Sequence, residues 1–361
     1  MKKASYLLVV IIAFTITTIK SQNFELKGHD FQEFSGLHYF SIKQNLSEFP
    51  EDSIRFLVTG DLQEKKPIVV FVHGSGNAPL ILSFDNDSFL FLAPLHNIMA
   101  EHRDNYHFVM ISKPGVPICL NGETTHTPWN MDTTTISKTF WECDMLEYHV
   151  NATKEVLKFI HQQNFADTSK IYLAGHSQGA RVVAKVAAEN PDLITKVAYM
   201  SCSLFGRFTH EIMQLYLNTM NKSLTHTEFV EQMDSTIYKR LQEFKYWGNY
   251  PNKSELTENH FITYFSLVSH YSFNRNMAVL ELMKIKMPLL VVYGTADIGA
   301  IDCSFLPLFL FDTDADYTLK AYPNYEHNYF LVGDNGERIH EEYHFDKVFN
   351  DVLKWFDETD I

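Results

Sequence analysis

The chain has 361 residues, of which 45% are hydrophobic and 20% are charged, and its formal net charge is −14. This composition is typical of a soluble globular enzyme with a large core. The length allows two domains, although α/β folds often exceed about 250 residues as one unit with insertions. Nucleic acid is not expected as a partner, because phosphate binding relies on clustered Lys and Arg that this chain lacks.

Residues 1–21 are typical of an export signal. Lys2 and Lys3 form a short positive region, and the following residues 4–19 are apolar or hydroxylic without a charge. We therefore expect a secreted or periplasmic protein whose mature chain begins near Gln22. The cleavage site is poorly marked, so an uncleaved membrane anchor is the alternative, and a membrane is expected as a partner only in that case.

Eight runs of residues predict the strands of one sheet. The first two, 37–42 and 54–58, are predicted as edge strands separated by a turn-prone segment. The later runs are continuously apolar and alternate with helix-like segments, which indicates a parallel sheet covered on both faces. They are 68–72, 107–111, 170–173, 197–200, 289–293 and 317–321. An amphipathic helix, 345–356, is predicted to end the fold.

More than eighty residues separate the strands 197–200 and 289–293, far beyond a normal connection, and they show helical spacing. We expect an inserted helical lid over 204–286, within a catalytic domain formed by 22–203 and 287–361. The large side chains of the lid either line an acyl pocket or form the lid's own core, and the second interpretation is preferred for any one of them. These side chains are Met213, Tyr216, Tyr246, Trp247, Tyr264, Phe265 and Tyr271.

The sequence Gly-His-Ser-Gln-Gly at 175–179 lies between the strand-like run 171–174 and the helix-like run 180–188. A G-x-S-x-G turn between strand and helix holds its serine in a strained backbone conformation, with the hydroxyl above the sheet edge. A plain turn rich in small residues is the alternative interpretation. The flanking strand and helix favour Ser177 as a nucleophile.

A serine nucleophile needs a base within hydrogen-bonding reach and a carboxylate that orients the base. Asp297 follows the strand 289–293 and His327 follows the next strand, so both are expected at the same sheet edge as Ser177. Ser, Asp, His is the chain order expected for this hydrolase geometry. Asp302 is a rival acid, but Asp297 is closer to the end of its strand.

A glycine-containing turn, His-Gly-Ser-Gly at 73–76, directly follows the strand 68–72. Such a turn lets backbone N–H groups point at a developing oxyanion without an obstructing side chain. A second donor is expected from the N–H of Gln178, the residue after the nucleophile. The sequence therefore predicts an oxyanion hole beside Ser177.

With these motifs the chain resembles the α/β-hydrolase superfamily over nearly all of residues 34–361. The resemblance is carried by HGSG at 73–76, GHSQG at 175–179, YGTAD at 293–297 and YEHN at 325–328. It implies a predominantly parallel eight-stranded sheet with helices on both faces and a lid inserted after the sixth strand. It also implies the following roles: Ser177 as nucleophile, His327 as general base and then acid, Asp297 as its orienting partner, and the backbone of Ser75 and Gln178 as oxyanion donors, with Gly76 as a substitute for Ser75.

We therefore expect a serine hydrolase that cleaves a carboxylic ester through an acyl-enzyme, with a small-molecule or acyl substrate. One alternative is a peptidase of the same fold, in which the acidic lid residues Glu228, Glu231 or Glu243 grip a free amino terminus. A second is a non-catalytic binding relative, although such relatives usually lose a triad member. Dehalogenase and epoxide-hydrolase chemistry is disfavoured, because those branches place an Asp where this chain has Ser177.

No metal or organic cofactor is required by this chemistry. The sequence His-Glu-Glu-Tyr-His at 340–344 matches H-E-x-x-H, which on a helix would place two imidazoles on one face for zinc. It overlaps the polar start of the predicted terminal helix, and no third ligand follows at a recognisable spacing. We therefore expect no metal site there.

Four cysteines in an exported chain allow up to two disulfides. A bridge between Cys119 and Cys143 is favoured, because it would close one long segment and contribute roughly 3–4 kcal/mol. Cys202 and Cys303 each follow a predicted strand. They either meet at one sheet edge or are two small buried side chains, and the second interpretation is preferred.

Overall fold

The computed structural model describes residues 36–50, 53–83, 89–91, 94–121, 137–249 and 258–358. The predicted export signal, residues 1–21, lies outside these ranges. No helix within them is long and apolar enough to cross a membrane.

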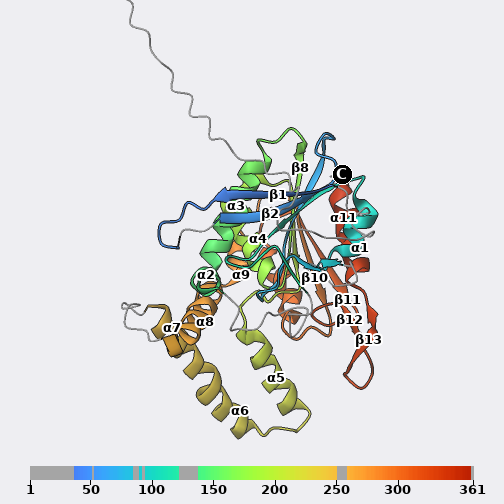
Figure 1. Ribbon diagram of the computed structural model, residues 1–361. Helices are drawn as coiled ribbons and strands as arrows, with labels where there is room; N and C mark the ends of the chain where they lie inside the picture. The colour runs from blue at the N-terminus through green and yellow to red at the C-terminus, as the bar shows by residue number, and fades with distance from the viewer. Residues whose placement is uncertain are drawn as a thin grey trace, which may run out of the picture.

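Eight strands form the central sheet (Figure 1). In spatial order they are β1 (Leu37–Lys43), β2 (Ser53–Thr59), β6 (His107–Ile111), β3 (Lys66–Val72), β8 (Ala166–His176), β9 (Lys196–Met200), β10 (Leu289–Gly294) and β11 (Tyr317–Tyr322). Strand β2 is antiparallel to both neighbours, and every other neighbouring pair is parallel. The predicted α/β fold with a predominantly parallel eight-stranded sheet is confirmed. The prediction of β2 as an edge strand is wrong, because β2 pairs with β6 as well as with β1.

The continuous apolar sequence of the inner strands follows from burial on both faces of the sheet. In β3, Ile68 and Val70 belong to one buried hydrophobic cluster, whereas Val69 and Phe71 belong to the other. Successive side chains of a strand point to opposite faces, so the two clusters lie on the two sides of the sheet. Each fully buried side chain of this size stabilises the fold by about 1.5–3 kcal/mol.

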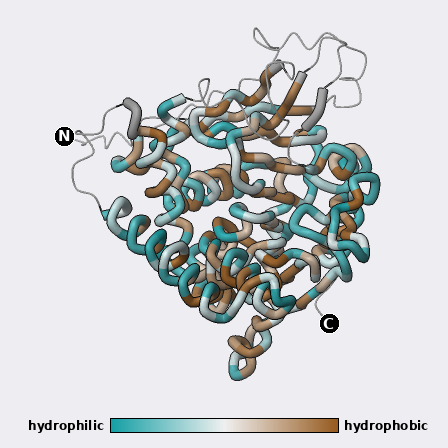
Figure 2. The backbone as a smooth tube through the Cα atoms, turned by 90° about the horizontal axis from the view of Figure 1, so that it is seen from below, coloured by the Kyte–Doolittle hydropathy of each residue, from teal (hydrophilic) through white to brown (hydrophobic). Residues whose placement is uncertain are grey.

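Helices cover both faces (Figure 1). The cluster on one face includes side chains of α3 (Leu146–Ile160) and α4 (Gln178–Glu189). The cluster on the other includes side chains of α1 (His96–His102) and of the predicted terminal helix, which the structure places as α11 (Phe345–Asp357). Figure 2 shows the hydrophobic segments gathered in the middle of the molecule, with hydrophilic helical turns around them.

The segment between β9 and β10 is helical. It contains α5 (Phe208–Met220), α6 (His226–Gln232), the π-helix η4 (Met233–Tyr238), α7 (Lys239–Gly248), α8 (Glu258–Asn274) and α9 (Ala278–Leu282). Figure 1 shows α5 to α8 together at one end of the sheet. A small core of their own holds them, built from Phe208, Leu215, Ile237 and Phe244.

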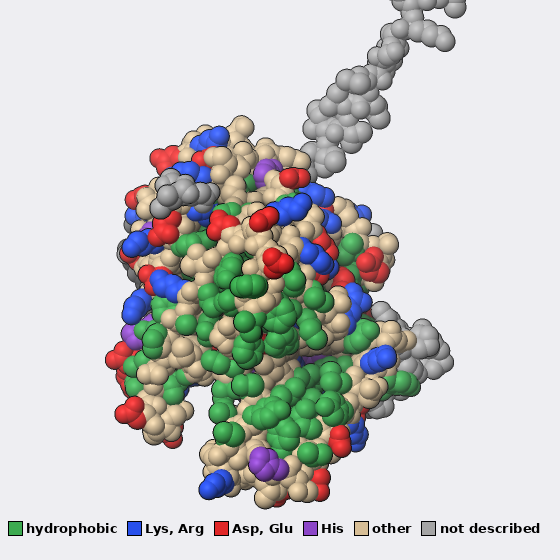
Figure 3. Space-filling view, turned by 180° about the vertical axis from the view of Figure 1, so that it is seen from behind, with side chains coloured by type: hydrophobic (Ala, Val, Ile, Leu, Met, Phe, Trp, Pro, Cys, Tyr) green, Lys and Arg blue, Asp and Glu red, His purple; other side chains and the backbone are tan. Residues whose placement is uncertain are grey.

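These inserted helices expose large apolar side chains to solvent. Tyr216, Met220 and Val230 are 52%, 79% and 57% exposed. Figure 3 shows hydrophobic side chains gathered on the surface of this part of the molecule. The inserted helices therefore bury less of their apolar surface than the helices against the sheet.

Short elements complete the fold. They are β4 (Ile81–Ser83), β5 (Phe89–Phe91), β7 (Cys119–Asn121), α2 (Lys138–Cys143), the 3-10 helices η3 (Pro191–Leu193) and η6 (Ile301–Phe305), α10 (Leu306–Leu310), β12 (Phe330–Val332) and β13 (Arg338–Tyr343). Strands β5, β4 and β7 form a three-stranded sheet, and β12 pairs with β13.

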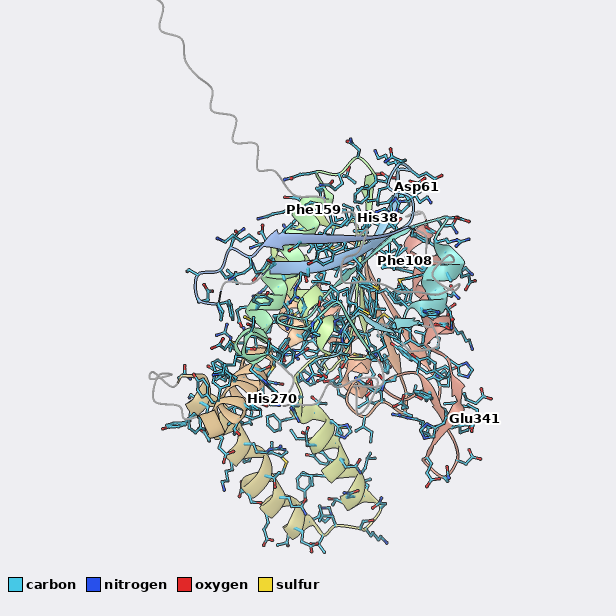
Figure 4. All side chains as sticks on the ribbon, in the orientation of Figure 1. His38, Asp61, Phe108, Phe159, His270 and Glu341 are labelled. Carbon is cyan, nitrogen blue, oxygen red and sulfur yellow. The ribbon has the colours of Figure 1, made fainter. Side chains whose placement is uncertain are left out.

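The H-E-x-x-H sequence lies in β13 and not on a helix. Residues 340–343 are part of this strand, and His344 precedes α11. Two residues four apart in a strand are separated by about 13 Å, so the two imidazoles cannot share one ion as they would on a helix. Glu341 (Figure 4) is exposed on the hairpin. No group of metal-ligating side chains occurs among the residues that the structure describes. The expectation that this sequence leads into the terminal helix is wrong, because residues 340–343 belong to β13, which pairs with β12.

The favoured disulfide is wrong, since none of the four described cysteines is bridged. Cys143 belongs to the hydrophobic cluster on one face of the sheet, and Cys119 packs against the cluster on the other. The sheet therefore separates them. Cys303 is buried and donates its thiol hydrogen to the backbone carbonyl of Cys202 at 3.1 Å, so this pair meets without a bridge.

Candidate active site

Ser177 occupies the sharp turn between β8 and α4. Its backbone has φ 57° and ψ −124°, a left-handed conformation that costs free energy for a residue with a side chain. The turn is held by the N–H of Ser177, which donates to the carbonyl of Met200 at 2.9 Å. Because two neighbouring strands fix the turn, the strain is maintained rather than relaxed.

The glycines of the motif are needed for close backbone approach. A Cβ on Gly175 would lie 2.4 Å from the carbonyl oxygen of Gly179, and one on Gly179 would lie 1.9 Å from that of Val72. Real Cβ atoms do not approach oxygen so closely. Both glycines therefore allow α4 to pack directly against the ends of β8 and β3.

His327 and Asp297 form a hydrogen-bonded chain with Ser177. His327 Nε2 lies 2.8 Å from Ser177 Oγ, and His327 Nδ1 lies 2.9 Å from Asp297 Oδ2. Asp297 is buried after β10, where its other carboxylate oxygen accepts the N–H of Gly299 at 3.0 Å. His327 lies after β11, as the sequence predicts. The three residues that the sequence singled out thus come together at one sheet edge.

Opposing effects act on the His327 imidazole. Burial lowers the pKa of His327, but the hydrogen bond and the charge of Asp297 raise it more, so the net pKa lies above the usual value. The backbone carbonyl of His327 accepts a hydrogen bond from His176 Nε2 at 2.9 Å. Burial, followed by the proximity of His327, lowers the pKa of His176 to about 3, so His176 remains neutral and acts as a fixed donor.

Asp302, the rival acid, does not contact His327. Its carboxylate accepts hydrogen bonds from Ser203 Oγ at 2.6 Å and from the N–H of Leu204 at 3.1 Å. Burial raises the pKa of Asp302, although these hydrogen bonds oppose the shift. Asp302 therefore holds the segment that leaves β9.

Of the predicted oxyanion donors, Ser75 and Gln178 line a cavity together with Ser177. Gly74 is so close to Ser177 that a Cβ there would be 3.1 Å from the serine Cβ. Ser75 lines the cavities around Ser177, whereas Gly76 lines neither of the two described here. Gln178 is the first residue of α4, where a backbone N–H has no acceptor within its helix.

A buried lysine fixes the side chain of Gln178. Lys113 donates from Nζ to Gln178 Oε1 at 2.7 Å and is only 4% exposed. Burial lowers the pKa of Lys113, and the nearby Asp144 carboxylate opposes this shift. The sequence offers no local signal for this role, because Lys113 is 65 positions from its partner.

Two cavities meet at Ser177 and His327. The first, of about 610 Å³, extends toward the inserted helices, and its lining includes Arg181, Arg207, His210 and His270 as well as the acids Asp297 and Glu326. Figure 4 labels His270, on α8 where the inserted helices meet the main body. The second, of about 760 Å³, extends toward β12 and β13.

The acyl-pocket interpretation of the inserted segment's large side chains is wrong, because none of the seven lines either cavity. Tyr264 and Phe265 are buried in a cluster with Met145, and Trp247 packs against it. Tyr216 and Tyr246 are exposed. The preferred interpretation, that such residues form the segment's own core, fits Tyr271, whereas the cluster of Tyr264 and Phe265 is shared with residues outside the segment.

Glu228, Glu231 and Glu243 are exposed on α6 and α7 and line neither cavity. Glu228 has a local role, since its carboxylate accepts the N–H of Thr225 at 2.8 Å in a capping box. These three acids are not placed to grip a substrate amine at Ser177.

Comparisons with known proteins give structural likeness alone. Neither a family model nor a curated protein sequence matches the chain. Porphyromonas gingivalis dipeptidyl peptidase 4 is similar with a TM-score of 0.51 and 10% identity, over 89% of this chain and 35% of that one. Pyrococcus horikoshii acylaminoacyl peptidase, in its orthorhombic crystal form, is similar with a TM-score of 0.50 and 12% identity, over 91% of this chain and 42% of that one.

A shorter protein is also similar. Acetyl xylan esterase 1 from Thermoanaerobacterium sp. JW/SL YS485 gives a TM-score of 0.46 and 15% identity, over 89% of this chain and 83% of that one. The present chain spans less than half of the length of the two peptidases. Taken with the sheet order, the likeness to the two peptidases shows that the chain has the fold of the α/β-hydrolase superfamily.

Proposed function

We propose that this protein is a serine hydrolase that cleaves a carboxylic ester through an acyl-enzyme on Ser177. The observation that carries the proposal is the chain of hydrogen bonds from Ser177 Oγ through His327 to Asp297, located where two cavities meet. A serine hydroxyl in this arrangement has a base in contact and a carboxylate that orients the base. These are the requirements for an activated nucleophile.

In the first half-reaction Ser177 Oγ attacks the ester carbonyl carbon while His327 Nε2 accepts its proton. The oxyanion that forms is bound by the backbone N–H groups of Ser75 and Gln178, each worth about 10²- to 10³-fold in rate. When the carbon–oxygen bond to the alcohol breaks, His327 donates the proton to the departing alcohol. Asp297 keeps Nδ1 protonated and stabilises the transient imidazolium.

In the second half-reaction a water molecule takes the place of the alcohol. His327 accepts a proton from this water as it attacks the acyl carbon, and then returns the proton to Ser177 Oγ. The products are the free carboxylic acid and the restored enzyme. The raised pKa of His327 favours the imidazolium that forms in both half-reactions.

A peptidase is the second candidate, and the likeness to dipeptidyl peptidase 4 and acylaminoacyl peptidase favours it. The ester is preferred, because the two acids that line the cavity on the side of the inserted helices, Asp297 and Glu326, already contact His327 and Arg338 and are not free to bind an amino terminus. We also propose that residues 1–21 direct export and that the inserted helices act as a lid over Ser177. Sequence supports the first of these, and the position of α5 and α8 at the cavity wall supports the second.

A fluorophosphonate probe tests the proposal directly. The purified wild-type protein should form a covalent adduct at Ser177, located by peptide mass mapping, and Ser177→Ala should form none while losing roughly 10⁴-fold or more in esterase rate. Ser235→Ala, an exposed serine in η4, is the matched control and should label like the wild type. An adduct on another serine, or full ester turnover by Ser177→Ala, would contradict the mechanism.

A further inference from the structure

Arg181 carries a buried positive charge beside the nucleophile. It lies in α4, one helical turn after Ser177, is only 8% exposed, and lines the same cavity as Ser177. Its Nη1 donates to the carbonyl of Ser203 at 3.5 Å, and its Nη2 donates to the carbonyl of Asn276 at 2.5 Å. In the part of the chain that the structure describes, both groups that bind this guanidinium are neutral carbonyls, and no carboxylate pairs with it.

An anion bound in this cavity would stabilise the buried charge of Arg181. Burying a charge is unfavourable unless it is paired, and two carbonyl oxygens offset only part of the lost hydration. A guanidinium has five N–H donors, of which the two bonds to carbonyls use two. The fork of an arginine matches the two oxygens of a carboxylate, which it can bind through two parallel hydrogen bonds.

The other charges of this cavity do not neutralise Arg181. Its two acids are already engaged, since Asp297 bonds to His327 and Glu326 forms an ion pair with Arg338 at 2.5 Å. The second cation of the cavity, Arg207, is exposed at the start of α5.

Arg207 has its own neighbours. Its Nε lies 3.8 Å from a Glu211 carboxylate oxygen, and its Nη1 lies 2.6 Å from His270 Nε2. Burial, followed by the charge of Arg207, lowers the pKa of His270 to about 4, so the imidazole is neutral near pH 7 and contributes no further charge. The charge that no described protein group balances is therefore that of Arg181.

We propose that Arg181 binds a carboxylate on the substrate, so that the protein hydrolyses esters that carry a second, anionic group. This inference rests on the proposed function and specifies its substrate class. Arg181 and Ser177 line the same cavity of about 610 Å³, so a short diacid ester could place its carboxylate at Arg181 while Ser177 attacks its ester carbonyl. Arg207, nearer to solvent, adds attraction for the incoming anion.

Paired substrates of equal size test this assignment. The charged substrate is the mono-para-nitrophenyl ester of glutaric acid, and its neutral counterpart carries a carboxamide in place of the free carboxylate. The wild type should hydrolyse the charged ester with at least a tenfold higher kcat/KM, mainly through a lower KM. Arg181→Met should lose this preference, falling about 10- to 100-fold on the charged ester while changing less than threefold on the neutral one.

A control separates binding from a structural role of Arg181. Lys185→Met removes a cation from the next turn of α4, a position that lines neither cavity, and should keep the wild-type preference. An equal loss on both esters in Arg181→Met, or a wild type that prefers the neutral ester, would overturn the proposal.

A binding measurement on an inactive variant tests the anion site independently of the proposed hydrolase activity. Ser177→Ala should bind monomethyl glutarate in calorimetry at least tenfold more tightly than its neutral carboxamide counterpart, methyl 5-amino-5-oxopentanoate, and adding Arg181→Met should abolish the difference. If this holds but the wild type hydrolyses neither ester, the anion site stands and the ester hydrolase does not. If Arg181→Met does not fold, equal affinity of Ser177→Ala for the two ligands would by itself reject the anion site.

Discussion

Asp297 determines the protonation behaviour of His327. Burial alone would lower the pKa of this imidazole, and the hydrogen bond and charge of Asp297 reverse the shift. Since only the neutral imidazole accepts the serine proton, kcat/KM should rise with pH through a midpoint above about 6.5, the ordinary value for histidine. Asp297→Asn should reduce kcat roughly 10⁴-fold and move this midpoint downward, as a pH–rate profile would show.

Asp302→Asn is the control for Asp297→Asn. Asp302 is also buried, but it bonds to Ser203 and to backbone N–H groups rather than to His327. The midpoint of its pH–rate profile should match that of the wild type, even if less of the protein folds, because a midpoint does not depend on enzyme concentration. A shift in Asp302→Asn comparable to that in Asp297→Asn would contradict the assignment of Asp297.

At the scale of elements, the contact between α4 and β3 positions the site. A Cβ on Gly179 would lie 1.9 Å from the carbonyl oxygen of Val72, so Gly179→Ala must push the start of α4 away from the sheet. We expect a loss of about 1–3 kcal/mol in the free energy of unfolding, measured in urea, because overpacking strains a close-packed contact. Esterase rate per folded molecule should also fall, since Ser177 and Gln178 move with the helix.

Ala188→Gly, near the other end of α4, separates these two effects. It should cost about 1 kcal/mol, because glycine weakens a helix interior, and should leave the rate per folded molecule unchanged. Equal activity losses in both variants would show that helix stability, and not the close contact at Gly179, governs the site.

At the scale of the whole molecule, the inserted helices α5 and α6 bury fewer of their residues than α4, which packs against the sheet. Helix α6 has no buried residue and α5 has two, whereas eight residues of α4 are buried. We therefore expect amides of α5 and α6 to exchange hydrogen with solvent faster than those of α4 and β8 in mass-spectrometric measurements. Covalent labelling of Ser177 should slow exchange around 206–210 and 270–274, which contribute to the cavity wall, but not in β1.

If α6 exchanged hydrogen as slowly as α4 before any ligand is added, the prediction that the inserted helices are less protected would be contradicted. Unchanged exchange in 206–210 after labelling would argue against their role as a lid.

The sheet was predictable because each strand of its core is buried on both faces and is therefore apolar throughout. Strand β13 was missed for the opposite reason, since nearly all its residues are exposed and no apolar period marks it. Strand β8 begins at Ala166, earlier than predicted, because Asp167 and its polar neighbours carry no strand signal. Local sequence thus identifies buried strands far better than exposed ones.

The site was predictable to the extent that its residues end strands. Ser177, Asp297 and His327 each follow a parallel strand, and parallel strands end at the same sheet edge. Arg181 lies within a helix and has no such signal. Lys113 does follow a strand, β6, but its sequence does not reveal its partner Gln178, which is far away in the chain. The Cys119–Cys143 prediction failed similarly, since spacing along the chain does not reveal which face of the sheet a side chain occupies.

The two carbonyls that bind Arg181 lie at opposite ends of the inserted segment. Ser203 follows β9, where the chain leaves the sheet, and Asn276 precedes α9, where it returns. A single guanidinium on α4 thus contacts the chain both where it leaves the sheet and just before it returns. The residue that we propose to bind the substrate's carboxylate is thus also a contact between the helix that follows Ser177 and the inserted segment.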